Sequence, residues 1–272
     1  MFDVFQKKNF SLFKALVRTD FKLRYQQNVI GYLWSILNPL MQFAIMYLVF
    51  VKFLRFGAGI PHFAVAMLLG IVIWTFFDEA THRSIGVVVW RGGLLRKMDF
   101  SKPIIVFSEI AMAAINFGIN LVVVFIFMII NGVRPSWSLL LIIPLVLELM
   151  LLTAGISFII ATVYVKFRDL EIIWNLALQL GFYLTPIIYP LSQLQDMSPT
   201  LLKIFLLNPM AQIITDFRAA MIGFDGGTYQ YMMDYILLYK PIALIPYVFS
   251  VVIFVAGFLI YNAKSQDFAE VI

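Results

Sequence analysis

Residues 110–133 read IAMAAINFGINLVVVFIFMIINGV, an uninterrupted run without Asp, Glu, Lys or Arg. About 20 apolar residues in a helix cross the hydrocarbon core of a bilayer, which is roughly 30 Å thick. The run is continuously apolar, whereas a barrel strand alternates apolar and polar residues. We therefore predict a transmembrane helix here.

The same pattern recurs along the chain. A further run is interrupted only by Glu148, and the others contain no charged residue. These runs cover residues 25–51, 56–77, 137–166, 172–195 and 241–263. With 110–133 they predict an all-α membrane protein with six transmembrane helices.

The composition agrees with this fold class and excludes several kinds of site. Hydrophobic residues make up 62% of the 272 residues and charged residues 13%, and the mean hydropathy is +0.93. A soluble domain is nearer half apolar and a quarter charged. Without cysteine there is no disulfide or thiolate metal site, and the two histidines, His62 and His82, stand apart in the sequence. We expect no metal site and no catalytic residue.

The basic residues predict how the chain crosses the membrane. An even number of spans puts both termini on one side, and that side carries most of the 20 Lys and Arg residues. Cytoplasmic segments carry such an excess, so we expect both termini in the cytoplasm and no nucleic-acid partner. No cleavable signal peptide is visible, because charged and mixed residues precede the first apolar run.

Residues 9–24 predict an amphipathic helix that is too polar to cross the membrane. Apolar residues recur at helical spacing on one side, and basic residues recur every four residues on another. The basic residues are Lys14, Arg18 and Lys22. The helix suits the cytoplasmic headgroup level, although an ordinary solvated helix packed on a partner would show the same pattern.

Three connecting segments carry further signals. The loop at 90–103 mixes apolar and basic residues around two glycines, which fits either a short projecting helix or a solvated turn. Pro186 and Pro190 must break or kink the fifth span. Asn208 and Pro209 then resemble a helix start, an N-cap followed by proline. We predict short re-entrant helices within 191–223, with a plain extracytoplasmic amphipathic helix as the alternative.

No phosphate-binding P-loop motif occurs, so any ATP is hydrolysed by a partner or the energy comes from an ion gradient. Intramembrane charges are the place to look for a gradient-driven relay. Glu79 and Arg83 are spaced to pair with each other, beside Asp78. Glu148 is a lone acid within a span. These acids leave open an ion-coupled secondary transporter. A membrane-embedded enzyme lacks a catalytic constellation to support it.

Seven short motifs occur in an order that resembles one family. They are TDFKLRY at 19–25, GYLW at 31–34, LNPL at 37–40, GLLRK at 93–97, FRDL at 167–170, YLTP at 183–186 and LNP at 207–209. Together they resemble the permease subunits of ABC transporters that export polysaccharides, such as O-antigen, capsule and teichoic acid. The order spans nearly the whole chain.

The resemblance implies an assembly and a function. The permease would be a homodimer in the bacterial cytoplasmic (inner) membrane, with two copies of a separate P-loop ATPase that binds ATP and Mg. It would export a lipid-linked polysaccharide or a teichoic-acid-like polymer. An ABC exporter of drugs or lipids with the same architecture stays open. The whole chain, 1–272, would be one permease domain, with an interfacial part at 1–30, the bundle at 31–263 and a cytoplasmic tail at 264–272.

The resemblance also implies roles for individual residues. The ATPase-coupling residues would be Gly92, Gly93, Leu94, Leu95, Arg96, Lys97, Met98, Asp99, Phe100, Phe167, Arg168 and Asp169. The substrate entrance and channel would use Arg18, Lys22, Arg24, Tyr32, Trp34, Tyr47, Trp174, Tyr183 and Tyr189. The gate helices on the exit side would include Asn208, Pro209 and Arg218.

Overall fold

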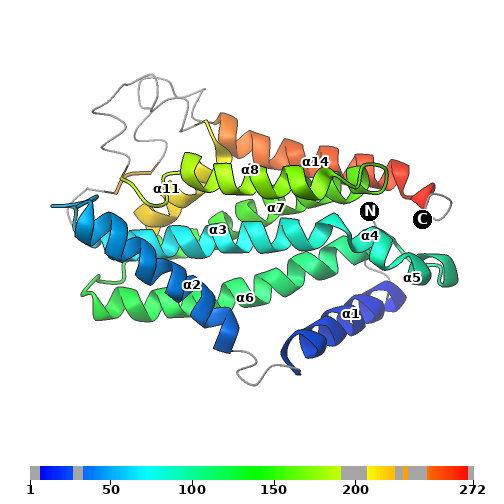
Figure 1. Cartoon of the computed structure of the whole chain (residues 1–272), viewed down its shortest axis with the longest axis horizontal. Coiled ribbons are helices and arrows are strands. Elements are labelled where there is room, and N and C mark those ends of the chain that lie inside the picture. The colour runs from blue at the N-terminus through cyan, green and yellow to red at the C-terminus, as the bar shows by residue number, and fades with distance from the viewer. Residues whose placement is uncertain (1–6, 27–32, 191–206, 224–228, 232–243, 269–272) are drawn as a thin grey trace.

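The computed structural model describes residues 7–26, 33–190, 207–223, 229–231 and 244–268, and these form helices joined by turns, with no strand among them (Figure 1). The elements are α1 (Lys7–Gln26), α2 (Leu33–Met46), η2 (Tyr47–Phe53), α3 (Phe63–Ile85), α4 (Val87–Trp90), α5 (Gly92–Lys97), α6 (Pro103–Ile130), η3 (Trp137–Leu141), α7 (Ile142–Tyr164), α8 (Leu170–Leu184), α11 (Pro209–Ile222) and α14 (Ile245–Lys264). The predicted all-α class is confirmed.

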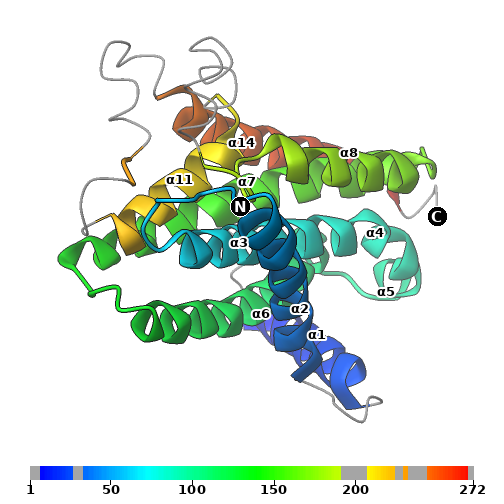
Figure 2. The same cartoon turned by 60° about the vertical axis from the view of Figure 1, so that its left-hand side comes forward.

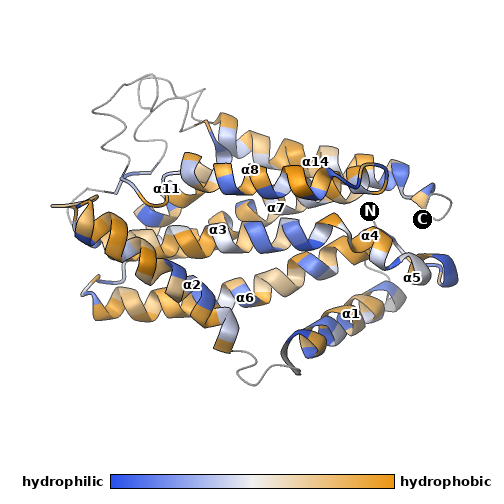
Figure 3. Ribbon diagram, viewed as in Figure 1, coloured by the Kyte–Doolittle hydropathy of each residue, from blue (hydrophilic) through white to orange (hydrophobic). Residues whose placement is uncertain are grey.

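Helix α3 is the centre of the bundle. It packs against α6, α7, α2, α8 and α11, and Figures 1 and 2 show these helices around it. In its apolar stretch 78% of the residues are buried, against 6% in the continuous helix formed by α2 and η2. Figure 3 shows apolar residues along most of each long helix, as expected for a chain whose solvent is lipid.

The number of full-length spans differs from the predicted six. Five helices are long and apolar enough to cross, and α8, at Leu170–Leu184, is shorter. The helix predicted at 172–195 ends early because Pro186 has no N–H to continue it, and Thr185 before it is extended. The last residues of that predicted span, 191–195, lie outside the described part of the chain.

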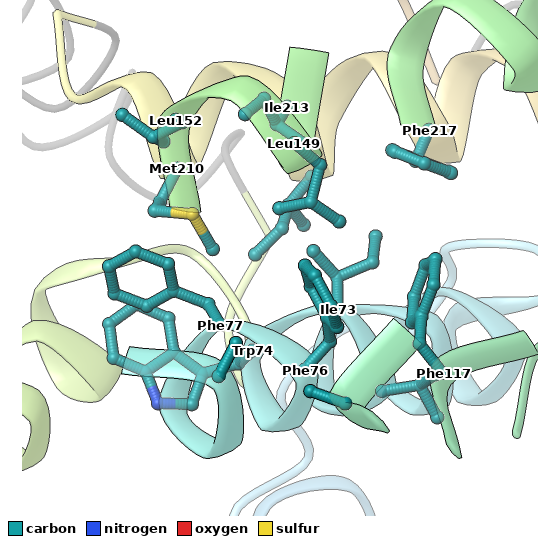
Figure 4. Packing of buried hydrophobic residues seen from close by; sticks show 14 of the residues in the cluster. Ile73, Trp74, Phe76, Phe77, Phe117, Leu149, Leu152, Met210, Ile213 and Phe217 are labelled. Atoms are coloured by element: carbon teal, nitrogen blue, oxygen red, sulfur yellow. The ribbon is translucent and has the colours of Figure 1, made fainter. Parts of the chain in front are cut away.

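Inside the bundle, α11 packs on α3 and α7 through large apolar side chains. Figure 4 shows Met210, Ile213 and Phe217 of α11 pointing toward the same space as Ile73 and Phe76 of α3. Every residue of α11 from Met210 to Ile222 is buried. A plain amphipathic surface helix, the alternative, would expose one face, so for α11 the structure favours the predicted helix that dips into the bundle.

Helix α2 contains Pro39, which lies within the helical run Leu33–Met46. Proline cannot bond to the carbonyl four residues earlier, which belongs to Ser35. The side-chain amide of Asn120 on α6 donates a hydrogen bond to that carbonyl oxygen at 3.2 Å. The break in α2 therefore fixes a contact between α2 and α6, since freed carbonyls in lipid need a donor.

Two glycines allow the backbones of α7 and α14 to approach closely. Helices α7 and α14 pack together more extensively than any other pair. A Cβ on Gly155 would lie 2.5 Å from the backbone nitrogen of Phe254, and one on Gly257 would meet the carbonyl oxygen of Gly155. Small residues let helix backbones approach in membranes, and here only glycine fits.

We expect Gly257→Val to lower the stability of the purified protein, because its side chain would push α14 away from α7. Overpacking of this kind costs about 1–3 kcal/mol. Gly118→Val on α6 is the matched control, since a Cβ there meets nothing within 4 Å. Thermal denaturation in mild detergent measures both. Equal midpoints for the two variants would show that the crossing does not depend on Gly257.

Candidate coupling and export site

One end of the bundle gathers the predicted coupling residues. Helices α1, α4 and α5 and the C-terminal end of α14 lie at this end (Figure 1), which we call the α5 end. The loop predicted as either a helix or a turn forms a helix, α5 (Gly92–Lys97). Leu95 is buried in the core, whereas Arg96, Lys97, Met98 and Asp99 are exposed. The buried leucine anchors a helix whose charged residues face outward.

The turn between α7 and α8 carries the second set of predicted coupling residues. Phe167 is 67% exposed there. The guanidinium of Arg168 lies 5.3 Å from the ring centroid of Tyr164, a cation–π distance. Asp169 precedes the first residue of α8 as its N-cap residue. An exposed aromatic residue beside a basic one suits a surface that binds another protein.

A chain of ion pairs ties α1 to the base of α5. Arg91, directly before α5, pairs with Asp20 of α1 and with Glu109 of α6, in the latter case at 2.7 Å. Glu109 also accepts from Arg83 of α3 at 2.8 Å. Glu109 is 5% exposed. Four elements thus meet in one network, the Glu109 network, formed by Asp20, Arg83, Arg91 and Glu109.

A second pairing joins α1 to the bundle. Arg24 of α1 pairs with Glu79 of α3, and the side-chain amide of Asn116 on α6 donates to the same carboxylate at 2.8 Å. Glu79 and Arg83 were predicted to pair with each other along α3. The structure instead gives each a partner on another helix, because side chains at the packed face of α3 meet α1 and α6.

At the opposite end, Arg218 of α11 is buried against the broken end of α8. It is 4% exposed. Its guanidinium donates to the carbonyl oxygens of Pro186 at 2.6 Å and Ile187 at 2.9 Å, and to Ala66 of α3 at 3.0 Å. The planar donor set of arginine suits several acceptors at once. Arg218 therefore holds the break after α8 against α3.

The start of α11 follows the predicted capping pattern. The side chain of Asn208 accepts a hydrogen bond from the backbone nitrogen of Met210 at 3.0 Å, and Pro209 occupies the first turn. The amide of Asn208 also donates to the hydroxyl of Thr185 at 3.3 Å. The predicted N-cap is confirmed, and it joins α11 to the break after α8. The rest of the predicted gate segment, 191–206, lies outside the described residues.

Glu148, the lone acid of the sequence analysis, lies in a polar cluster with α11 and α14. The amide of Gln212 donates to Glu148 at 3.3 Å and to Asp216 at 2.9 Å. The hydroxyl of Tyr247 donates to the same carboxylate of Asp216. Such hydrogen bonds join helices in lipid, where water is absent.

The predicted channel aromatics that the structure describes lie on α2, on η2, on α8 and in the segment after α8. Trp34 on α2 and Tyr183 on α8 are half exposed, at 54% and 50%. Tyr47 packs on Phe43 of α2, with ring centroids 5.6 Å apart. Tyr32 lies outside the described residues.

The other two predicted channel aromatics make specific hydrogen bonds. The indole nitrogen of Trp174 donates to the hydroxyl of Thr81 at 3.1 Å. The hydroxyl of Tyr189 donates to the carbonyl oxygen of Tyr183 at 3.1 Å. Both hydrogen bonds hold α8 and the segment after it in place. Trp174 and Tyr189 therefore have a structural role beside the predicted role in the channel.

A family model for ABC-2 type transporters matches residues 11–222. The chain belongs to this family. It is 31% identical over 265 residues to an "O-antigen export system permease protein RfbA" of Klebsiella pneumoniae, covering 97% of this chain and 95% of the relative. A Myxococcus xanthus protein of the same name is 30% identical over 256 residues, covering 94% and 93%.

The comparisons confirm the resemblance and its main consequences. The chain is a multi-pass membrane permease of an ABC transporter, which works with a separate ATPase subunit, and is not itself an enzyme. Family membership also favours this class over the ion-coupled transporter. Within the described residues, no group of three or more His, Asp or Glu side chains is placed to hold a metal ion.

Asp20, Arg91 and Glu109 are the residues that sequence reasoning missed as a set. Asp20 was noted only within the TDFKLRY motif, and Glu109 sits at the edge of an apolar run. A signal was available, because an acid beside a transmembrane segment needs a partner. The sequence did not indicate which of the basic residues supplies it.

Replacing Glu109 with Gln should destabilise the protein and loosen α1, because Arg91, which pairs with Asp20 of α1, loses its second carboxylate. Arg83 and Arg91 would both lose a carboxylate, and breaking a buried ion pair from one side costs about 3 kcal/mol or more. Asp267→Asn removes an exposed carboxylate at the same end and is the control. Thermal denaturation and protease cleavage after α1 report the change. Unaltered cleavage in Glu109→Gln would contradict the proposed anchoring of α1.

Replacing Arg218 with Leu should cost more stability than replacing it with Lys. Leucine removes the Arg218 donor from the carbonyls of Pro186 and Ile187, which lie beyond the end of α8, whereas lysine restores one of the hydrogen bonds. Each unsatisfied buried group costs about 1–3 kcal/mol. Denaturation midpoints in detergent should fall in the order wild type, Lys, Leu. A leucine variant as stable as the wild type would show that Arg218 does not hold the break.

Proposed function

We propose that this chain is the membrane subunit of an ATP-driven exporter that moves a lipid-linked, O-antigen-like polysaccharide out across the bacterial cytoplasmic membrane. The observation that carries the proposal is the match along nearly the whole chain to permeases named for O-antigen export. A teichoic-acid-like polymer has related chemistry and is the nearest alternative cargo.

The α5 end would face the cytoplasm and bind the ATPase. Arg96 and Lys97 are exposed on α5, and Phe167 and Arg168 lie on the α7–α8 turn of the same end. The excess of basic residues in cytoplasmic segments supports this orientation and the placement of both termini there. ATP and Mg would be bound by the ATPase, with none bound by this chain.

The Glu109 network would transmit the movement of the ATPase into the membrane. When the ATPase closes on ATP, it would displace α5. Arg91 lies directly before α5 and pairs with both Asp20 and Glu109, so a shift of α5 would move α1 and α6. The interfacial helix and the base of the bundle would then respond together.

A homodimer would place the conducting path between two copies. Helices α2 and α8 both contact α3 and expose large apolar side chains. The exposed residues include Met41 and Ile45 on α2 and Leu176 and Leu180 on α8. In a dimer, the exposed Trp34 and Tyr183 of these helices could stack on sugar rings of the polymer.

The substrate entrance would use the exposed basic side chains of α1. Arg18 and Lys22 are exposed, whereas Arg24 is paired with Glu79. Two exposed cations at the headgroup level can attract the phosphates of a lipid carrier. Arg24 belongs to the structural pairing of α1 rather than to this exposed pair.

The double variant Arg96→Glu/Lys97→Glu tests the coupling role. We expect a loss of co-purified ATPase and at least a tenfold fall in polymer export, because two cations of the docking surface become anions. Arg134→Glu is the matched control, since Arg134 is exposed between α6 and η3, at the opposite end of α6 from α5. Surface polysaccharide and bound ATPase are measured in a strain that carries each variant.

Unchanged ATPase binding and export in the double variant would contradict the assignment of α5. Normal surface polysaccharide in a strain that lacks this chain would overturn the proposed cargo. The two results are independent, so one failure does not conceal the other.

A further inference from the structure

An apolar groove of about 420 Å³ lies between α1 and the bundle. It is formed by four helices, and α2 and α8, the proposed dimer helices, do not line it. Side chains that line it include Phe10 and Phe13 of α1, Ala111 and Ala114 of α6, Ala154 of α7 and Phe254 of α14. The small alanine side chains leave the groove open, and the phenylalanine rings form its walls.

The groove is about as long as one bilayer leaflet is thick. The α6 residues that line it run from Ile104 to Ala114, over which the helix rises roughly 15 Å at about 1.5 Å per residue. This is near half the hydrocarbon core of roughly 30 Å. With α1 at the headgroup level, as its amphipathic pattern predicts, the groove would run from Phe10 and Phe13 toward the middle of the bilayer.

The apolar lining of the groove determines what kind of molecule can bind in it. Its lining side chains are apolar, and an apolar cavity offers water no hydrogen-bond partners. At this depth of a membrane, the apolar chains at hand are those of lipids. The length of the groove matches a chain that starts at headgroups and ends near the bilayer centre.

A lysine close in sequence to the two phenylalanines of the groove favours an anionic headgroup. Lys14 is exposed and lies within one turn of both Phe10 and Phe13 on α1. Among the described residues, none of the ion pairs involves Lys14. A cation at the headgroup level attracts anionic lipids.

We propose that this groove is a binding site for one anionic phospholipid of the leaflet on the α1 side, with an acyl chain between α1 and helices α6, α7 and α14 and its phosphate beside Lys14. The lipid would fill the space under the N-terminal half of α1. The ion pairs of Asp20 and Arg24 hold the C-terminal half of α1 on the bundle. The lipid would add contacts between the N-terminal half of α1 and the bundle. The proposal does not depend on which polymer is exported.

The test is native mass spectrometry of the permease–ATPase complex, titrated with phosphatidylglycerol and separately with phosphatidylcholine. We expect one phosphatidylglycerol per permease chain to be retained, with weaker retention of phosphatidylcholine. Ala111→Leu/Ala114→Leu should weaken phosphatidylglycerol binding at least tenfold by filling the groove. Lys14→Gln should remove the preference between the two lipids.

Two further variants separate the groove from general effects. Phe10→Ala opens the wall at a residue that is 59% exposed, so the fold should survive while lipid retention falls. Val122→Phe adds bulk to a residue of α6 that is 57% exposed and lies outside the groove, and should retain lipid as the wild type does.

Equal retention of phosphatidylglycerol by the wild type, the groove-filled variant and Phe10→Ala would overturn the proposal. Retention of a polyprenyl-linked glycan in the groove would also overturn it, since the occupant would then be the cargo. Because export is not measured, a failure here leaves the proposed function untouched, and a failure of export leaves this result untouched.

Discussion

Backbone carbonyls that proline frees inside a membrane need donors from other helices, and this requirement organises the bundle. Lipid offers no hydrogen bond, so an unpaired carbonyl there is costly. The side-chain amide of Asn120 donates to the carbonyl of Ser35, whose helical donor Pro39 lacks. Arg218 donates to the carbonyls of Pro186 and Ile187, which lie beyond the point where proline ends α8. Each helix break is therefore the site of a specific contact between helices. The break in α2 contacts α6, and the break after α8 contacts Arg218 of α11, which also bonds to α3.

At the α5 end, acidic side chains are likewise paired with partners outside their own helices. Glu109 is nearly buried and has two arginine partners, one on α3 and one beside α5. Because Arg91 also pairs with Asp20, the surface segment that would meet an ATPase is joined to the interfacial helix without an intervening flexible link. A bundle held by paired charges and capped breaks can transmit a displacement, since packed elements shift as units.

Much of the fold could be predicted from the sequence, because apolar runs, prolines and the Asn208–Pro209 helix start act locally. The early end of α8 follows from Pro186, which the sequence marks as a break inside a span drawn to residue 195. The full burial of α11 could not be predicted, since it depends on what packs beside it. At the site, the residues of the 90–103 loop left a helix and a turn both open, and the structure shows the helix, α5. The partners of Glu79 and Arg83 were not, because spacing along one helix says nothing of α1 and α6.

The absence of cysteine from the chain allows the central claim to be tested with single cysteines. Lys97→Cys, placed on α5, is cross-linked in native membranes with a short thiol-to-amine reagent, and adducts are identified by mass spectrometry, with Arg134→Cys as the reference position. The account predicts that only the α5 position forms an adduct with a P-loop ATPase. An ATPase adduct at Arg134→Cys and none at Lys97→Cys would contradict it.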